Sequence, residues 1–304
     1  MTGHGDRVTA EQTSGPPTSD TQTSESQQNA PVREDYEPEI EDAFYRLEGE
    51  GRTRLARSWP TLITTALVGG IDIGTGVFAY LVVYSITHST LLAGLAFSVA
   101  FVALLLARSE LFTENFLVPV IAVVAGRSSL LALTRLWVTT LVFNLVGCWA
   151  MGWLIVTARP DLRPTAVETG TKYAHLGITL ESLALAVLAG LVITLMTRMQ
   201  NATENLGVQL VPAVLFGAVL AGGQLFHSVL DSLFMFAALH AGAPFGYLDW
   251  LGALGWSVLG NVIGGVGLVT FLRLVRVPGK VAEERSRAGR RYGTGAHPSG
   301  TESG

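Results

Sequence analysis

The sequence has little of what a water-soluble protein carries at its surface. Only 14% of its 304 residues are charged, against about 25% in soluble domains. Lysine occurs only at Lys172 and Lys280, and the single cysteine, Cys148, excludes a disulfide scaffold and a cysteine metal site. Apolar residues make up 49% of the chain, and there are 34 glycines. This composition excludes an ordinary soluble enzyme and predicts a membrane protein with several spans.

The two ends of the chain differ in composition from its middle. Residues 1–35 are polar and acidic, which predicts a disordered N-terminal tail. Residues 36–59 carry charge and spaced apolar residues, which predicts an amphipathic helix lying at the membrane interface. Residues 277–304 are basic, and we expect a disordered C-terminal tail suited to anionic lipids rather than to nucleic acid. Residues 60–276 remain as the membrane domain.

Six apolar stretches are candidate spans, because a bilayer core about 30 Å thick needs about 20 apolar helical residues. They are residues 61–86, 90–125, 131–157, 179–199, 207–241 and 249–275. The second and the fifth are too long for one helix and are interrupted, at Arg108-Ser109-Glu110 and at Gly222-Gly223-Gln224. Non-helical backbone at membrane depth is tolerated only where protein buries it or where it lines a cavity. Each of these spans is therefore predicted to be two half-helices joined by a break.

Arginine sets the expected orientation, because cytoplasmic loops carry an excess of basic residues. One side of the predicted bundle holds Arg52, Arg54, Arg57, Arg127, Arg135, Arg198, Arg273, Arg276 and Lys280. The other side holds Arg159, Arg163 and Lys172. We therefore expect a multi-pass protein of the cell's inner or plasma membrane with both termini in the cytoplasm.

The two halves of the membrane domain echo each other. Glu110-Leu111-Phe112-Thr113 returns as Gln224-Leu225-Phe226-His227, at an offset of 114 residues. Asn144 returns as Asn261, and Gly70 as Gly190, at offsets of 117 and 120. A repeat of three spans puts the halves in opposite orientation, and inverted repeats with broken helices are typical of transporters and channels. The predicted fold is all-α, with six transmembrane helices as two inverted three-helix repeats.

Four motifs, in this order and spacing, resemble the formate/nitrite transporter family from about residue 40 to 275. They are Gly69-Gly70-Ile71-Asp72-Ile73-Gly74-Thr75-Gly76, Ser109-Glu110-Leu111-Phe112-Thr113-Glu114-Asn115, His227-Ser228 and Gly260-Asn261-Val262-Ile263-Gly264-Gly265. The resemblance implies an aquaporin-like fold and a homopentamer with one pore per protomer. It also implies passage of small monovalent anions such as formate or nitrite, often with a proton, and no cofactor.

The resemblance also implies a pathway through the protein. Thr113 and His227 would face each other at its centre, with Lys172 on the extracytoplasmic side and Asn261 on the last span. Apolar constrictions above and below would be formed by Phe97, Phe101, Leu111, Ile193 and Leu220. In this sequence a Phe-Glu-His-Ser stretch of the family is Leu225-Phe226-His227-Ser228, and the asparagine that usually follows is Asp231. The sequence thus resembles a divergent branch.

The chemistry of these side chains fits the implied roles, and each side chain could instead have a purely structural role. An imidazole changes charge near neutral pH, so His227 could attract an anion or hand it a proton, or could be a hydrogen-bonded core residue. Thr113 could donate to an anion or cap its half-helix. Lys172 could concentrate anions or snorkel at the interface.

Two further residues complete the set of candidates. Asn261 could bond the first interruption, donate to His227 or join helices. Asp231 lies one helical turn after His227 and could pair with its imidazole. Glu110, Glu114 and Arg108 are charges near the breaks, so we expect them to be paired or to face the cytoplasmic side.

Two other functions compete with anion transport. The same fold could conduct a neutral solute such as water or glycerol, and a non-transporting membrane protein could use the acidic tail to bind a partner. No motif of an enzyme, nucleotide site or metal site is found in the sequence. We expect no enzymatic activity, metal or cofactor.

Overall fold

The computed structural model describes residues 38–272 and residue 286, with side chains from Tyr45 onward except those of residues 268 and 269. The predicted tails, 1–35 and 277–304, fall outside this description apart from residue 286. Regular structure within it is entirely helical. The helices are α1 (Pro38–Leu55), α2 (Trp59–Thr87), α3 (Thr90–Phe97), α4 (Val99–Ala107), η1 (Phe112–Phe116), α5 (Val118–Val124), α6 (Leu130–Ala158), η2 (Pro160–Leu162), α7 (Arg163–Ala174), α8 (Leu180–Gln200), α9 (Leu206–Gly222), α10 (Ser228–His240), α11 (Tyr247–Val262) and η3 (Ile263–Thr270).

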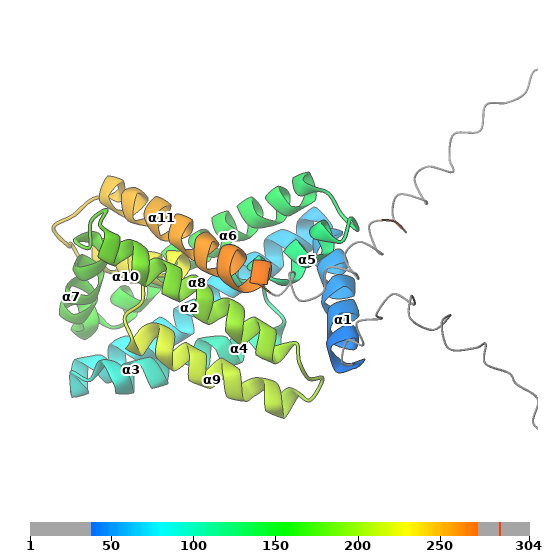
Figure 1. Cartoon of the computed structure of the whole chain (residues 1–304). Coiled ribbons are helices and arrows are strands. Elements are labelled where there is room, and N and C mark those ends of the chain that lie inside the picture. Colours follow the sequence, from blue (N-terminus) through cyan, green and yellow to red (C-terminus); the bar gives the residue numbers. More distant parts are fainter. Residues whose placement is uncertain (1–37, 273–285, 287–304) are drawn as a thin grey trace, which may run out of the picture. The chain divides into compact units, whose positions relative to one another are not determined.

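Five of the helical segments are long and apolar enough to cross a membrane: α2, α3 with α4, α6, α8, and Tyr247–Gly267. The predicted fifth span is instead built from α9 and α10, which are each shorter. The protein is therefore an all-α, multi-pass membrane protein, and its helices are consistent with six spans of which two are broken (Figure 1).

The two interrupted spans break in the same backbone conformation. Arg108 follows α4 with φ 51°, and Gln224 follows α9 with φ 51°. A left-handed residue at this place ends a helix, since it turns the next amide back onto the last turn. Accordingly Ser109 N–H donates to Leu104 O and Leu225 N–H donates to Leu220 O, both at 3.2 Å. We call residues 108–111 the first break and residues 223–227 the second break.

The helices of the two halves pack in corresponding pairs, α2 against α6 and α8 against α11. Two glycines make the close crossings possible. A Cβ on Gly70 would lie 2.3 Å from Asn144 O, and one on Gly190 would lie 2.1 Å from Asn261 O. Neither position accepts a side chain, so the helices meet backbone to backbone at both asparagines.

Two short helices complete the architecture. Helix α1 packs on α5, where a Cβ on Gly51 would lie 2.4 Å from Val118 O. Arg135 of α6 binds the end of α1, since its Nη2 donates to Leu55 O at 2.9 Å. Helix α7 lies between the predicted third and fourth spans, and it packs against α10 (Figure 1).

Candidate permeation site

Each break is held by one buried asparagine in the same way. Asn144 Oδ1 accepts from Phe112 N–H at 2.9 Å, and its Nδ2 donates to Ala66 O at 2.6 Å and Glu110 O at 2.8 Å. These groups come from α2, the first break and the start of η1, so the single side chain ties all three to α6. It satisfies the Phe112 amide and the Glu110 carbonyl, which would otherwise be stranded at membrane depth.

Asn261 repeats this arrangement at the second break. Its Oδ1 accepts from Ser228 N–H at 3.0 Å, and its Nδ2 donates to Ala186 O and Phe226 O, both at 2.9 Å. All three described partners belong to α8 and to the second break or its edge. Asn261 therefore joins helices around the second break, and the alternatives of bonding the first break or the ring of His227 are wrong.

His227 and Thr113 meet between the two breaks. Thr113 Oγ1 lies 2.9 Å from His227 Nε2, and both side chains are fully buried. The other ring nitrogen, Nδ1, accepts from Leu230 N–H at 3.1 Å, so His227 is the N-cap of α10. A nitrogen that accepts from an amide carries no proton, so the hydrogen of a neutral ring is on Nε2, where it donates to Thr113 Oγ1.

Thr113 does not begin a half-helix as predicted. It lies within the 3-10 helix η1, whose N-cap is Leu111, and α5 follows only after Leu117. The N-cap role considered for Thr113 is therefore wrong. Its hydroxyl instead accepts from His227 and keeps its own hydrogen for a further acceptor.

Asp231 pairs with His227 through the backbone rather than through the imidazole. Asp231 Oδ2 accepts from His227 N–H at 2.6 Å, while both ring nitrogens have the other partners described above. The prediction that the carboxylate pairs with the ring is thus wrong. The reason is geometric, because an N-cap side chain turns forward over its helix while the carboxylate one turn later reaches back to the cap amide.

Lys172 lies in the last turn of α7, and its Nζ donates to Gln224 Oε1 in the second break. The side chain is exposed. This contact places a positive charge beside the second break, on the side of the protein where α7 packs.

The five predicted constriction residues are all buried. Phe97, Phe101, Leu111, Ile193 and Leu220 belong to one apolar core cluster, each exposed by 1% or less. The rings of Phe97 and Phe101 meet edge to face with centroids 5.8 Å apart. The structure therefore places these side chains in the apolar core shared by the two halves.

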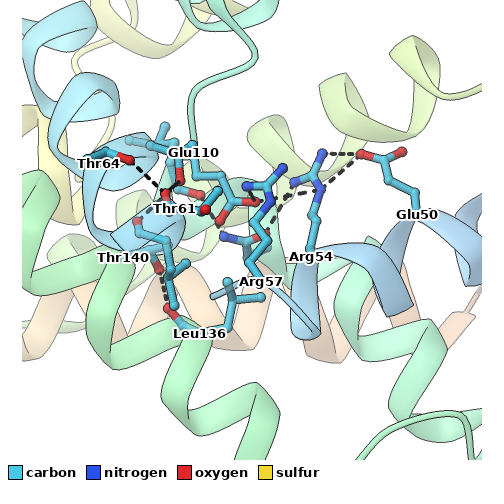
Figure 2. Close-up of polar contacts among 12 residues, drawn as sticks. Glu50, Arg54, Arg57, Thr61, Thr64, Glu110, Leu136 and Thr140 are labelled. Atoms are coloured by element: carbon cyan, nitrogen blue, oxygen red, sulfur yellow. Dashed lines mark hydrogen bonds and ion pairs between the residues drawn. The ribbon is translucent and has the colours of Figure 1, made fainter. Parts of the chain in front are cut away.

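Glu110, one of the charges predicted near the first break, is paired, whereas Arg108 is exposed. Figure 2 shows Arg54 and Arg57 directed toward Glu110, which is 1% exposed. Arg57 forms an ion pair with Glu110 Oε1, and Arg54 Nε lies 4.0 Å from the same oxygen. Burial by itself would lower the pKa of the Arg54 guanidinium. The negative charges of Glu50 and Glu110 together outweigh burial, so the net shift of the pKa is upward. Arg54 also donates to Asn115 Oδ1 at 3.2 Å.

Sequence reasoning missed three residues of the site. Asn144 was visible as the echo of Asn261, but no role was assigned to it. Asp72 lies inside the first glycine motif, and its carboxylate accepts from Ser109 Oγ of the first break. A lone acidic residue in an apolar span was the available signal for Asp72. Ser109 carried no signal of its own.

Two breaks at membrane depth, bridged by a buried threonine–histidine contact, are the arrangement of a membrane channel or transporter rather than of an enzyme. Residues 41–275 match the family model described as formate/nitrite transporter. The chain belongs to the formate/nitrite transporter family.

Relatives of known sequence agree with this assignment. The chain is 24% identical over 261 residues to the inner membrane protein YfdC of Escherichia coli strain K12, covering 79% of this chain and 80% of that protein. It is 26% identical over 201 residues to a probable formate transporter of Methanothermobacter thermautotrophicus, covering 60% of this chain and 73% of the relative.

Solved structures show the same fold. An ion channel of this family superposes with a TM-score of 0.69 at 18% identity, covering 78% of this chain and all of that one. A pentameric formate channel with formate bound superposes with a TM-score of 0.59 at 20% identity, covering 71% of this chain and 96% of that one.

Proposed function

We propose that this protein is a transmembrane channel or transporter for small monovalent anions, namely formate, nitrite or a similar monocarboxylate. The observation that carries the proposal is the contact of 2.9 Å between Thr113 Oγ1 and His227 Nε2. Thr113 lies in η1, just after the first break, and His227 ends the second break. Both side chains are buried, and the chain belongs to a family of transporters. A related solved structure is a formate channel with formate bound, which supports the substrate class.

The anion is bound by side chains rather than by free amides. The amides at the start of α10 are largely taken, since His227 N–H, Ser228 N–H and Leu230 N–H all have side-chain acceptors. What remains is a relay in which His227 Nε2–H donates to Thr113, whose hydroxyl then donates to the anion. A hydroxyl polarised in this way is a stronger donor, because linked hydrogen bonds reinforce one another.

The approaches to this contact differ in character. Lys172 supplies a positive charge that concentrates anions on the α7 side of the protein. The constriction residues, Phe97, Phe101, Leu111, Ile193 and Leu220, strip water from the anion before it reaches Thr113. The family and its solved relative also support a homopentamer with one pore per protomer. We propose that both termini face the cytoplasm, as the arginine distribution indicates.

Uptake into proteoliposomes tests the proposal. Formate, nitrite, acetate, lactate and hydrosulfide are offered at two pH values to the wild type and to the variants His227→Ala and Thr113→Val. Removing one donor to an ionised acceptor costs about 1.5–3 kcal/mol, so each variant should lower uptake of the preferred anion about 10- to 100-fold. Thr140→Val is the matched control, because Thr140 is buried and its hydroxyl donates, within the described part of the chain, to carbonyls of its own helix.

Two results would overturn the proposal. Flux of water or glycerol without any flux of anions would replace it with conduction of a neutral solute. Uptake of anions that is equal in His227→Ala, Thr113→Val and the wild type would remove the threonine–histidine contact from the pathway.

A further inference from the structure

Asp231 carries a buried oxygen that has no partner. The side chain is 2% exposed, and its Oδ2 accepts from His227 N–H. Its Oδ1 is buried without a hydrogen bond among the described residues. An ionised carboxylate oxygen in this position would lose its hydration without replacement, which is costly. A proton on Oδ1 removes that cost, since the carboxyl group is then neutral.

The groups that face Asp231 leave it few ways to stay ionised. Helix α7 brings Lys172 and Tyr173 within electrostatic range, and α2 brings Tyr80. Lys172 is the only cation among these described neighbours, and its exposed Nζ is engaged with Gln224. Helix α6 brings a titratable group to α10 in Cys148, whose thiol contacts Val229 O. Helix α11 contacts α10 through the uncharged Trp250 indole, which donates to Ser232 Oγ.

The imidazole of His227 is poorly placed to hold the same proton. A second ring proton would sit on Nδ1, where it would point at the N–H of Leu230. Two donors cannot satisfy each other, so protonation would break the cap of α10. The carboxyl group one turn further along has a free oxygen and needs no such rearrangement.

We propose that Asp231 is the group that carries the proton accompanying the anion through this protein. The inference rests on the proposed function and deepens it. The carboxylate of Asp231 takes a proton from hydronium on the α7 side, which leaves a water molecule and forms an O–H bond at Oδ1. That bond breaks as the proton passes to the carboxylate of the anion, which moves on as the neutral acid and leaves Asp231 ionised for the next proton.

A purely structural role would make Asp231 a helix cap and nothing more. Asp249 is that case, since its Oδ2 accepts from Gly246 N–H at 2.8 Å at the start of α11 while its side chain stays exposed. The two aspartates make the same kind of backbone bond and differ in burial and in the unpartnered oxygen. Asp249→Asn is therefore a matched control for Asp231→Asn.

The test uses the full chain in proteoliposomes with labelled formate and an entrapped pH-sensitive dye, after subtraction of protein-free vesicles. In the wild type and in Asp249→Asn, protons should enter with formate, and uptake should rise as the outer pH falls, by up to about tenfold per pH unit for one titrating group. Asp231→Asn keeps the acceptor for His227 N–H but cannot hold the proton. It should carry formate without protons, with a flat pH profile.

The outcomes separate the two proposals. A wild type that carries no anion at any pH overturns the proposed function. A wild type that carries formate while Asp231→Asn keeps its proton entry and pH slope overturns only the role of Asp231. Asp231→Glu should retain proton entry, and a flat profile in that variant would show a geometric role instead. If Asp231→Asn fails to assemble, Asp231→Ser provides the same acceptor without a titrating proton and is judged by the same two readouts.

Discussion

The first and the second break have the same backbone design and different chemistry. Both follow a left-handed residue, Arg108 or Gln224, and both are held by an asparagine with three backbone partners. At the first break Glu110 also has a buried oxygen without a described hydrogen bond, Oε2, but its Oε1 is paired with Arg57 and lies near Arg54, so two cations offset its charge. At the second break Asp231 keeps one buried oxygen without a described partner.

The residues that stabilise the two breaks differ from those that we propose to act on the anion. The asparagines are used identically, so their role is to satisfy interrupted backbone. The remaining polar side chains are not repeated, since Leu111 is the N-cap of η1 at the place where His227 is the N-cap of α10. Because the N-cap of η1 is a leucine and that of α10 is a histidine, only His227 of these two N-cap residues can bond Thr113 through an imidazole.

The largest expected effect comes from removing either asparagine. Asn144→Ala and Asn261→Ala each strand one amide and one carbonyl of the interrupted backbone, at about 1–3 kcal/mol for each buried group left unpaired. Both variants should lower the thermal stability of the detergent-solubilised protein to a similar extent, measured by loss of the monodisperse chromatographic peak on heating. Asn201→Ala is the control, because the Asn201 side chain donates to Thr197 O in α8, the helix that it caps, and joins no separate elements through this bond. Strongly unequal losses would contradict the equivalence of the two breaks.

Filling the close crossings should cost less. Gly70→Ala and Gly190→Ala place a Cβ against the carbonyl of Asn144 or Asn261, and overpacking of this kind costs about 1–3 kcal/mol. The same melting assay should show a loss in both variants. Gly252→Ala on α11 has nothing within 4 Å of its new Cβ and should melt at least as high as the wild type. A neutral result at Gly190 would show that α8 and α11 have room to shift.

The smallest effect is expected at the charged side of the first break. Arg57→Ala removes the ion pair between a partly exposed arginine and the buried Glu110, and the cost should stay at about 1 kcal/mol because Arg54 remains 4.0 Å from the same carboxylate oxygen. The amides of α1 should then exchange hydrogen faster, while those of α10 stay protected. Arg159→Ala breaks an exposed pair with Asp161 and should leave both rates unchanged. Unaltered exchange in α1 would mean that its other contacts, those of Gly51, Arg54 and Arg135 among them, hold that helix without this ion pair.

The sequence predicted the breaks well and their register less well. The interruptions at residues 108–110 and 222–224 fall where α4 and α9 end. The echo between Glu110-Leu111-Phe112-Thr113 and Gln224-Leu225-Phe226-His227 has an offset of 114, whereas Arg108 and Gln224, in the same left-handed conformation, are 116 apart. Similar residue types at the two breaks therefore do not mark structurally equivalent positions. The alignment of the two halves is set by the left-handed backbone residue and not by the side chains.

Three other features of the structure could not be predicted from the local sequence. Helix α7 is moderately polar and short, and its contact with α10 stabilises it. The first amide of η1, Phe112 N–H, is held by Asn144, a partner 32 residues away. The partner of Asp231 within the cap also depends on how His227 turns over α10, which no spacing rule predicts.

The sequence by itself determined that this is a membrane protein of helical spans with two breaks, because apolar length, glycine and stranded charge are local properties. It also determined the family, since the order of several short motifs is a property of the chain alone. Only the tertiary structure decided which polar groups meet: Thr113 with His227, Asn144 and Asn261 with the breaks, and Asp231 with an amide rather than an imidazole. Hydrogen bonds depend on angles and distances of a few tenths of an ångström, and those are fixed by packing between segments far apart in the chain.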